Sequence, residues 1–341
     1  MISHDKKTCN LFTNWLMITL GLIFLMIIVG GLTRLTGSGL SITEWELFTG
    51  ILPPLNQSTW EKYFELYKTI PQFKIMNPEM QLDEFKIIFY WEYGHRVLGR
   101  LIGLFVIIPL LYFSLIKKIS FDKLKIYYFL FLLILCQGFI GWYMVESGLV
   151  NNITVSHYRL SLHLTLAIII ISLIFWQILS FRQDKFKIFF KFSLNRTPYL
   201  ILIFLIFFQI VFGAFVSGLD AGKLYQTWPL MNQSYFPDDV QIINFSDLFI
   251  LQDHSLVQFY HRNIAYFITI YIIVLSFFIF KNKNKEFYNA IFILLSVVLI
   301  QVILGILTLL SNLHVAIALA HQISSVILVL SALNLYYSVI K

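Results

Sequence analysis

Eight apolar runs, each about as long as a membrane-spanning helix, constrain this sequence more than any other feature. The runs cover residues 15–33, 96–116, 127–145, 158–179, 198–217, 259–280, 287–310 and 315–340. Each comes close to the ~20 residues that a helix needs to cross a hydrocarbon core of about 30 Å. Lipid cannot satisfy an open backbone, so runs of this length are expected to be helical. We therefore predict an all-α polytopic membrane protein with eight transmembrane helices.

The composition supports this fold class. Of the 341 residues, 58% are hydrophobic and only 13% are charged, which is the balance of a polytopic membrane protein and not of a soluble enzyme. The net charge of +7 does not indicate a nucleic-acid partner, because the sequence shows no folded basic face. The two cysteines, Cys9 and Cys136, lie in the N-terminal tail and in the third run, so no structural disulfide is expected.

Lysine and arginine residues fall in alternate connections between the runs. The basic set comprises Lys6, Lys7, Lys117, Lys118, Lys123, Lys125, Arg182, Lys185, Lys187, Lys191, Arg196, Lys281, Lys283 and Lys285. The other connections hold most of the carboxylates, namely Glu44, Glu46, Glu61, Glu65, Glu79, Asp83, Glu84, Asp220, Asp238, Asp239, Asp247 and Asp253. Cytoplasmic loops carry the excess of Lys and Arg. We therefore expect a bacterial inner-membrane protein with both termini in the cytoplasm and the acidic loops in the periplasm.

The second half of the chain repeats the first. Five residues recur at one constant offset of 183: Gly30, Gly39, Trp45, Leu47 and Pro54 match Gly213, Gly222, Trp228, Leu230 and Pro237. His95–Arg96 matches His261–Arg262 at an offset of 166, Gln137 and Gly141 match Gln301 and Gly305 at 164, and His163 matches His321 at 158. Because each half has an even number of spans, four, both halves begin on the same side of the membrane. We expect two four-helix bundles in a parallel repeat, with a pseudo-two-fold axis along the membrane normal. The halves would cover residues 1–195, with a long periplasmic loop at 36–90, and residues 196–341.

Four of the eight histidines lie in or at the start of the even-numbered spans, one in each: His95, His163, His261 and His321. All four lie within about two turns of the outer end of their span. Neutral imidazole is a strong axial ligand for heme iron, and two facing helices can supply a pair. The simplest pairing lies within each half, His95 with His163 and His261 with His321. One such histidine alone is equally well explained as an interhelical hydrogen-bonding residue, but four at equivalent positions favour a functional site.

Three arginines lie beside these histidines. Arg96 and Arg262 directly follow a histidine, and Arg159 lies four residues before His163 on the same helix face. A heme propionate needs a cation where the porphyrin meets the aqueous edge, so each arginine is a candidate propionate ligand. Snorkelling to the membrane interface, or binding of a lipid phosphate, explains each arginine equally well.

The two halves differ at one position close to the histidines. Glu92 lies one turn before His95, whereas the equivalent residue of the second half is Gln258. A carboxylate at only one of the two sites indicates chemistry in the first half and a permanent cofactor in the second. In a site of low dielectric constant, such a carboxylate can act as a base or stabilise a developing cation. The alternative is an interfacial ion pair between Glu92 and Arg96 or Arg100.

Several long stretches carry a resemblance to a known family. They are GGLTRLTGSGLSITEWELFTGILPP at residues 30–54, PPLNQSTWEKYF at 53–64, FKIIFYWEYGHRVLGRLIG at 85–103, FGAFVSGLDAGKLYQTWPLM at 212–231 and QFYHRNIAY at 258–266. These stretches closely resemble the heme A synthase family, in its proteobacterial and mitochondrial branch. The likeness covers nearly the whole membrane region, from about residue 30 to residue 321.

The resemblance implies that the chain is an oxidoreductase that converts heme O to heme A for cytochrome c oxidase. In this family, the C8 methyl group of the porphyrin is oxidised to a formyl group by successive hydroxylations. The family's substrate-side histidines fall on His95 and His163, and its bound heme b falls on His261 and His321. Its functional glutamate falls on Glu92. The implied cofactor is therefore a bis-histidine heme b, and the implied substrate is heme O.

The resemblance also implies partners. A heme O synthase is the expected supplier, cytochrome oxidase assembly factors and membrane lipid are expected neighbours, and a homo-oligomer is left open. Bacillus-type members carry cysteine pairs in their outer loops, and this chain has none there, so a thiol-based step is not carried over. Two other classes remain as alternatives: a di-heme electron carrier and a transporter. The carrier is disfavoured because all four histidines lie toward the outer side, and a transporter would be colourless.

Overall fold

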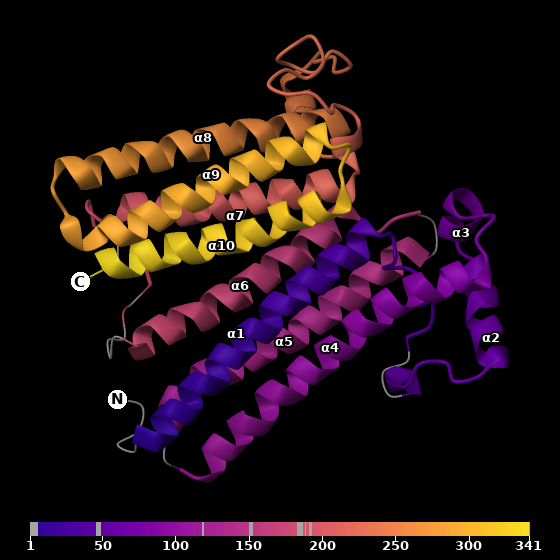
Figure 1. Ribbon diagram of the computed structural model, residues 1–341, viewed down its shortest axis with the longest axis horizontal. Helices are drawn as coiled ribbons and strands as arrows, with labels where there is room; N and C mark the ends of the chain where they lie inside the picture. Colours follow the sequence, from indigo (N-terminus) through magenta and orange to yellow (C-terminus); the bar gives the residue numbers. More distant parts are fainter. Residues whose placement is uncertain are drawn as a thin grey trace. The chain divides into compact units, whose positions relative to one another are not determined.

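The computed structural model describes residues 6–45, 49–117, 119–149, 153–182, 187, 189–190 and 193–340. Within these ranges the chain forms helices and no strand (Figure 1). Eight of the helices are long and apolar enough to cross a membrane. They are α1 (Lys6–Leu35), α4 (Leu82–Leu115), α5 (Phe121–Leu149), α6 (His157–Arg182), α7 (Thr197–Gly218), α8 (His254–Lys281), α9 (Tyr288–Leu310) and α10 (Val315–Val339). The predicted all-α membrane fold with eight spans is confirmed.

Shorter helices lie in the connections between the spans. They are η1 (Thr49–Ile51), α2 (Gln57–Lys68), α3 (Pro71–Met76), η2 (Ala221–Lys223), η3 (Phe245–Phe249) and η4 (Lys285–Phe287). Helix α2 begins after Asn56, whose side chain accepts a hydrogen bond from the backbone N–H of Thr59 and caps the helix. Its buried residues Trp60 and Phe64 pack in one hydrophobic cluster with Phe89 of α4. This cluster fixes the connection between α1 and α4 on the first turns of α4.

Helix α4 begins well before the apolar run that predicted it. The run starts at residue 96, whereas the helix starts at Leu82. A capping box forms this start, since the backbone N–H of Gln81 donates to Glu84 Oε2 at 2.9 Å. The predicted loop at 36–90 therefore contains α2, α3 and the first turns of α4. His95 consequently lies inside a continuous helix, with more than three turns before it.

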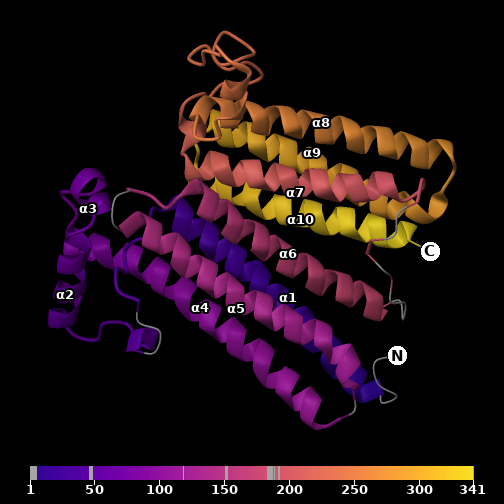
Figure 2. The ribbon, with the colours of Figure 1, turned by 180° about the vertical axis from the view of Figure 1, so that it is seen from behind.

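By its internal contacts the chain divides into two units, Met1–Ile174 and Phe175–Lys341. In the first unit, α1, α4, α5 and most of α6 lie side by side (Figures 1 and 2). Phe12 packs edge-on against Phe113 and Tyr127, with ring centroids 5.0 and 4.8 Å away, and this joins α1 to α4 and α5. The helices are thus held by aromatic packing, as expected where both lipid and core are apolar.

The second unit holds α7 to α10, which also run alongside one another (Figures 1 and 2). A ring cluster of Trp176, Phe189 and Tyr336 packs at one end of this unit. At the other end, the connection 219–253 leaves α7 and returns to α8. The division at 195/196 and the pseudo-two-fold relation of the halves stay predictions.

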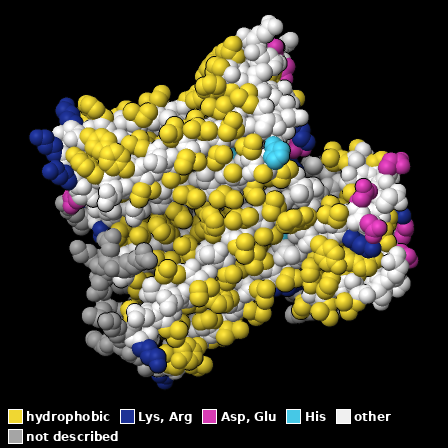
Figure 3. All heavy atoms as spheres, viewed as in Figure 1, with side chains coloured by type: hydrophobic (Ala, Val, Ile, Leu, Met, Phe, Trp, Pro, Cys, Tyr) yellow, Lys and Arg dark blue, Asp and Glu magenta, His cyan; other side chains and the backbone are white. Residues whose placement is uncertain are grey.

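The charged side chains separate along the helices of each unit. On the face in Figure 3, apolar side chains cover the length of the helices, most Lys and Arg lie at one end, and most Asp and Glu lie at the other. This is the charge distribution that the predicted topology requires. Of the residues used for that prediction, Lys118, Lys185, Lys191 and Glu46 lie outside the described residues.

Candidate functional site

The structure brings together the two histidines of each predicted pair. The ring centroids of His261 on α8 and His321 on α10 are 6.4 Å apart, and the ring planes lie at 85° to each other. His95 on α4 is close enough to His163 on α6 for the two rings to interact electrostatically. All four side chains are partly exposed, so they are neither sealed in a packed core nor open on the surface.

The spacing of the second pair fits a heme iron. Two metal–imidazole bonds of about 2 Å each, with the rings pointing away from the metal, separate the ring centroids by roughly 6 Å. A porphyrin supplies the remaining in-plane ligands, so two histidines are sufficient. The described part of the chain contains no group of three or more His, Cys, Asp or Glu side chains that would hold a bare metal ion. The pair therefore suits a heme.

A buried donor beside this pair also fits a heme. Arg262 directly follows His261 and is only 8% exposed. Its Nη1 donates to the carbonyl of Thr227 at 2.9 Å, and its Nη2 donates to the carbonyl of Tyr225 at 2.8 Å. Its Nε has no hydrogen-bond partner among the described residues. A buried guanidinium N–H without an acceptor is a suitable partner for an anionic group of a bound ligand.

Glu92 is buried, with 3% exposure, and both oxygens of its carboxylate are used. Oε1 accepts from Nη2 of Arg96 at 2.6 Å and from its Nε at 3.1 Å. Oε2 accepts from Oγ of Ser41 at 2.8 Å and from the backbone N–H of Ile42 at 2.9 Å. The carboxylate thus joins α4 to the connection that leaves α1. The ion pair with Arg96 is present, and a catalytic role for Glu92 stays a prediction.

The second half makes the corresponding contact with an amide. Gln258 Nε2 and Arg262 Nη2 both donate to the carbonyl of Tyr225, at 2.9 and 2.8 Å. Tyr225 lies 183 residues after Ile42, whose carbonyl accepts from Arg96 Nη2 at 2.9 Å. In each half an arginine therefore holds the carbonyl at the same position of the repeat. The difference is that a carboxylate accompanies the arginine in the first half and a neutral amide accompanies it in the second.

A hydrogen-bond network holds the connection 219–253 beside the second pair. The hydroxyl of Tyr225 lies 2.7 Å from Oδ1 of Asp238 and 2.6 Å from Oδ1 of Asp239 and shares its one proton between them. The hydroxyl of Ser255 donates to Oδ2 of Asp239 at 2.7 Å. Burial raises the pKa of Tyr225, and so do its hydrogen bonds to the two carboxylates. Burial alone would raise the pKa of Asp239, but the hydrogen bonds from Tyr225 and Ser255 hold it below its usual value. This network keeps the carbonyl of Tyr225 in reach of Arg262.

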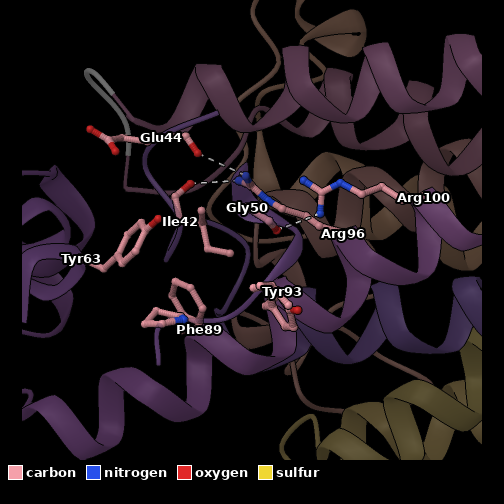
Figure 4. Close-up of a pocket in the computed structure, with 10 residues that line it drawn as sticks. Ile42, Glu44, Gly50, Tyr63, Phe89, Tyr93, Arg96 and Arg100 are labelled. Atoms are coloured by element: carbon pink, nitrogen blue, oxygen red, sulfur yellow. Dashed lines mark hydrogen bonds between the residues drawn. The ribbon is translucent and has the colours of Figure 1, made fainter. Parts of the chain in front are cut away.

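Figure 4 shows a small hollow between α4 and the connection that joins α1 to α4. Its lining residues are Ile42, Glu44, Gly50, Leu52, Pro54, Tyr63, Phe89, Tyr93, Arg96 and Arg100. Arg100 Nη1 donates to the carbonyl of Gly50 at 3.2 Å, and the hydroxyl of Tyr93 donates to the carbonyl of Ile51 at 2.6 Å. Arg96 also lines the hollow, and its guanidinium carbon is 5.4 Å from the ring centroid of Trp45. Residues of α4 spaced three and four apart therefore hold the connection between α1 and α4 against this helix.

The third candidate arginine has a different environment. Arg159 Nη1 donates to the backbone carbonyl of Tyr143 at 2.6 Å, and the guanidinium carbon lies 3.7 Å from the centroid of the Tyr143 ring. This contact joins the start of α6 to the end of α5. All three candidate arginines thus have backbone carbonyl partners, and binding of propionates by Arg96, Arg159 or Arg262 stays a prediction.

Arg96 was one of the two arginines expected beside Glu92, but the contacts of Glu92 with Ser41 and Ile42 were not predicted from the sequence. Ser41 and Ile42 carry no chemistry of their own, and one of the two contacts is made by a backbone N–H. The signal that identifies the position is the repeat, because Ile42 and Tyr225 occupy equivalent places. The glycines and glutamines that recur with the histidines are a second group whose contacts were not predicted.

The fold and the site define a multi-pass helical membrane protein with histidine pairs inside its spans. Residues 13–333 match the model of a family described as cytochrome oxidase assembly protein. The chain is similar to proteins named heme A synthase from Pelagibacter ubique (strain HTCC1062), 49% identical over 326 residues and 95% of both chains, and from Rickettsia africae (strain ESF-5), 40% identical over 335 residues, 97% of this chain and 98% of that one. It is 42% identical to the heme A synthase of Wolbachia pipientis wMel over 321 residues, 94% of this chain and 90% of that one. The chain belongs to this family of heme A synthases and cytochrome oxidase assembly proteins.

Proposed function

We propose that this chain is an oxidoreductase that converts heme O to heme A and so supplies heme A to cytochrome c oxidase. The observation that supports this most directly is the set of four histidines in two pairs. The second pair has a spacing suited to heme iron. Relatives of nearly the same length carry the name heme A synthase.

The two pairs have different roles in this proposal. His95 and His163 are the axial ligands of the substrate heme O, and His261 and His321 are the axial ligands of a resident heme b. The partner-free Nε of the buried Arg262 supports the second assignment, because it offers a donor to a propionate. Heme b, when bound, supplies one-electron transfer between the substrate site and an external acceptor. The residues 1–195 and 196–341 are thus a substrate half and a cofactor half.

The reaction changes one methyl group of the porphyrin. Each hydroxylation removes two electrons and one proton from the carbon and adds a hydroxyl from water, and the water releases the second proton. Two hydroxylations give a gem-diol, which loses water to leave the formyl group at C8. The four electrons pass to an external electron acceptor, and the four protons pass to solvent or to basic side chains.

Glu92 is the residue proposed to act on this carbon. Removing electrons from a methyl group on a conjugated macrocycle builds positive charge on the carbon. A carboxylate near that carbon stabilises the charge or accepts the proton of the incoming water. Glu92 lies one turn from His95, and Gln258 at the equivalent place cannot ionise. This difference supports chemistry in the first half alone.

The membrane setting follows from the charge distribution. We infer that both termini and the basic loops lie in the cytoplasm of a bacterium, and that the heme sites lie toward the periplasmic side of the inner membrane. A substrate with an apolar tail reaches such a site sideways from the lipid. Heme O synthase is the inferred supplier, and cytochrome oxidase assembly factors are the inferred recipients.

The test is to express the chain in a bacterial host that makes heme O but not heme A. Membrane hemes are then extracted and separated by chromatography. We expect heme A to appear only when the chain is present, and the purified protein to contain heme b. A purified protein with heme b and no heme A formation would identify an electron carrier instead. A colourless protein would favour a transporter.

A further inference from the structure

Each histidine of the two pairs faces a glycine on a neighbouring span. A Cβ added to Gly141, Gly213 or Gly305 would lie 3.0, 3.1 or 2.9 Å from Cε1 of the facing histidine. These histidines are His163, His261 and His321. A Cβ on Gly30 would lie 3.1 Å from Nε2 of His95. Carbon atoms attract one another best at about 3.5–4.0 Å. A methyl group at any of these four positions would therefore displace the ring.

Three of the four glycines belong to one recurring motif. A glutamine precedes each by four residues, in the sequences QGFIG at 137–141, QIVFG at 209–213 and QVILG at 301–305. Residues four apart lie on the same face of a helix. Only the first span differs, where MIIVG at 26–30 has methionine in place of glutamine.

The glutamines hold the segments that carry the histidines. Nε2 of Gln137 donates to the carbonyl of His163 at 2.9 Å, and Nε2 of Gln209 donates to the carbonyl of His261 at 2.9 Å. The amide nitrogen of Gln209 also lies 3.0 Å from Nδ1 of His261, so it contacts both ring and backbone. A glutamine thus fixes the helix position from which the ring projects.

Gln301 acts through its backbone and its side chain. Its carbonyl lies 3.1 Å from Nδ1 of His321, and its side-chain oxygen accepts from the hydroxyl of Ser324, one turn further along α10. A proton on Nδ1 shared with a backbone carbonyl leaves Nε2 free to bind a metal. This is the tautomer that an axial heme ligand needs.

We propose that Gly141, Gly213 and Gly305, each with its glutamine, are positioning residues for heme ligands. Each glycine lets the imidazole rest against the backbone, and each glutamine fixes the helix that carries the imidazole. His95 has the glycine without the glutamine. Its ring is turned over relative to the other three, with Nε2 and not Cε1 toward the glycine.

This asymmetry deepens the proposed function and rests on it. A resident heme b has to stay bound, whereas a substrate heme has to enter and leave. Both ligands of the second pair have the glycine and the glutamine, whereas the first pair has one ligand held by glycine alone. Met26 cannot donate a hydrogen bond to the helix of His95. The first pair is therefore built for exchange of its heme, and the second for retention.

The test uses the full chain, purified from membranes of a heme O-producing host. Gly213→Ala and Gly305→Ala should each lower heme b affinity by about 10–100-fold, the usual effect of losing support behind a metal ligand. The heme that remains should show a shifted low-spin paramagnetic resonance signal. Gly138→Ala and Gly103→Ala are matched controls, because an added Cβ at either position meets nothing within 4 Å.

A milder variant covers the case in which the alanine variants do not accumulate. Gln209→Met places a methionine four residues before Gly213, as Met26 lies before Gly30 in the first span, and leaves Gly213 unchanged. It should keep heme b but release it to apomyoglobin faster than wild type, with a shifted midpoint potential. The positioning role would be overturned if Gly213→Ala, Gly305→Ala and Gln209→Met all behaved like Gly138→Ala. The quantities compared are the heme b content, the resonance signal, the midpoint potential and the rate of heme release. A wild-type protein without heme b would instead refute the proposed function itself.

Discussion

The sharpest prediction concerns replacement of Glu92 by glutamine. In the wild type, Glu92 accepts four hydrogen bonds, two from Arg96 and one each from Ser41 and Ile42. An amide retains an oxygen for two of these contacts and loses the negative charge. The second half shows that an amide is compatible with the local fold, since Gln258 donates to the carbonyl of Tyr225 beside Arg262.

Glu92→Gln is expected to have a limited effect on folding stability and a large effect on the rate of heme A formation. Removing one charge of a buried ion pair costs about 3–5 kcal/mol when the partner charge is left uncompensated. The hydrogen bonds that the amide oxygen keeps, each about 1.5–3 kcal/mol to a charged partner, recover part of this cost. A folded domain is stable by about 5–15 kcal/mol, so the fold survives. Loss of a positioned acid–base group costs about 100-fold or more in rate, or about 2.7 kcal/mol in the barrier. We expect Glu92→Gln to keep heme b and to form at least about 100-fold less heme A.

The assay is pigment analysis of membranes that also contain heme O synthase, with heme b content and thermal unfolding measured on the purified protein. Glu61→Gln is the matched control, because it makes the same change at an exposed residue of α2, which packs against α4. It should leave heme A formation unchanged. Near-normal heme A in Glu92→Gln would reduce Glu92 to an ion-pair partner of Arg96. Collapse of heme b content in that variant would show that the residue is structural.

Two further predictions concern the histidines of the first pair and the hydrogen-bond network around Asp239. His95→Ala and His163→Ala should keep heme b yet form no heme A, by chromatography of extracted hemes; full conversion by either variant would show that the first half is not the substrate site. Asp239 has a pKa below its unfolded value, so its stabilising contribution is complete above the unfolded pKa of about 3.9 and is lost as pH falls through the folded pKa. The wild type should therefore lose thermal stability below about pH 4 more steeply than Asp239→Asn; parallel curves for the two proteins would contradict this role.

The number and type of the spans were predictable from the sequence, because an apolar run of about 20 residues has one stable conformation in lipid. The histidine pairs were predictable because the repeat marks equivalent positions. Pairing two histidines within one four-helix bundle is also simpler than pairing them between bundles. Structure is therefore predictable from sequence where one physical constraint, such as the need to satisfy the backbone in lipid, dominates.

The start of α4 and the contacts of Glu92 with Ser41 and Ile42 were not predictable in the same way. Residues 82–95 are less apolar than the span that follows, and their helix depends on the capping box at Gln81 and on packing against α2. The contact of Glu92 with the backbone of Ile42 depends on the path of a connection, which hydropathy does not describe. The glycines that contact the histidines recur in the sequence, but the contacts themselves can be identified only when the neighbouring helix is placed beside the histidine.

The most direct test of the account is the low-spin heme spectrum of the purified protein and of four single alanine variants. We propose that a bis-histidine heme b binds to His261 and His321, whose ring centroids are 6.4 Å apart. Absorption and paramagnetic resonance spectra of the wild type should show this heme. His261→Ala and His321→Ala should lose or alter the signal, because each removes one axial ligand, whereas His95→Ala and His163→Ala should retain it. An unchanged low-spin signal in both His261→Ala and His321→Ala would contradict the assignment of the second half as the cofactor site.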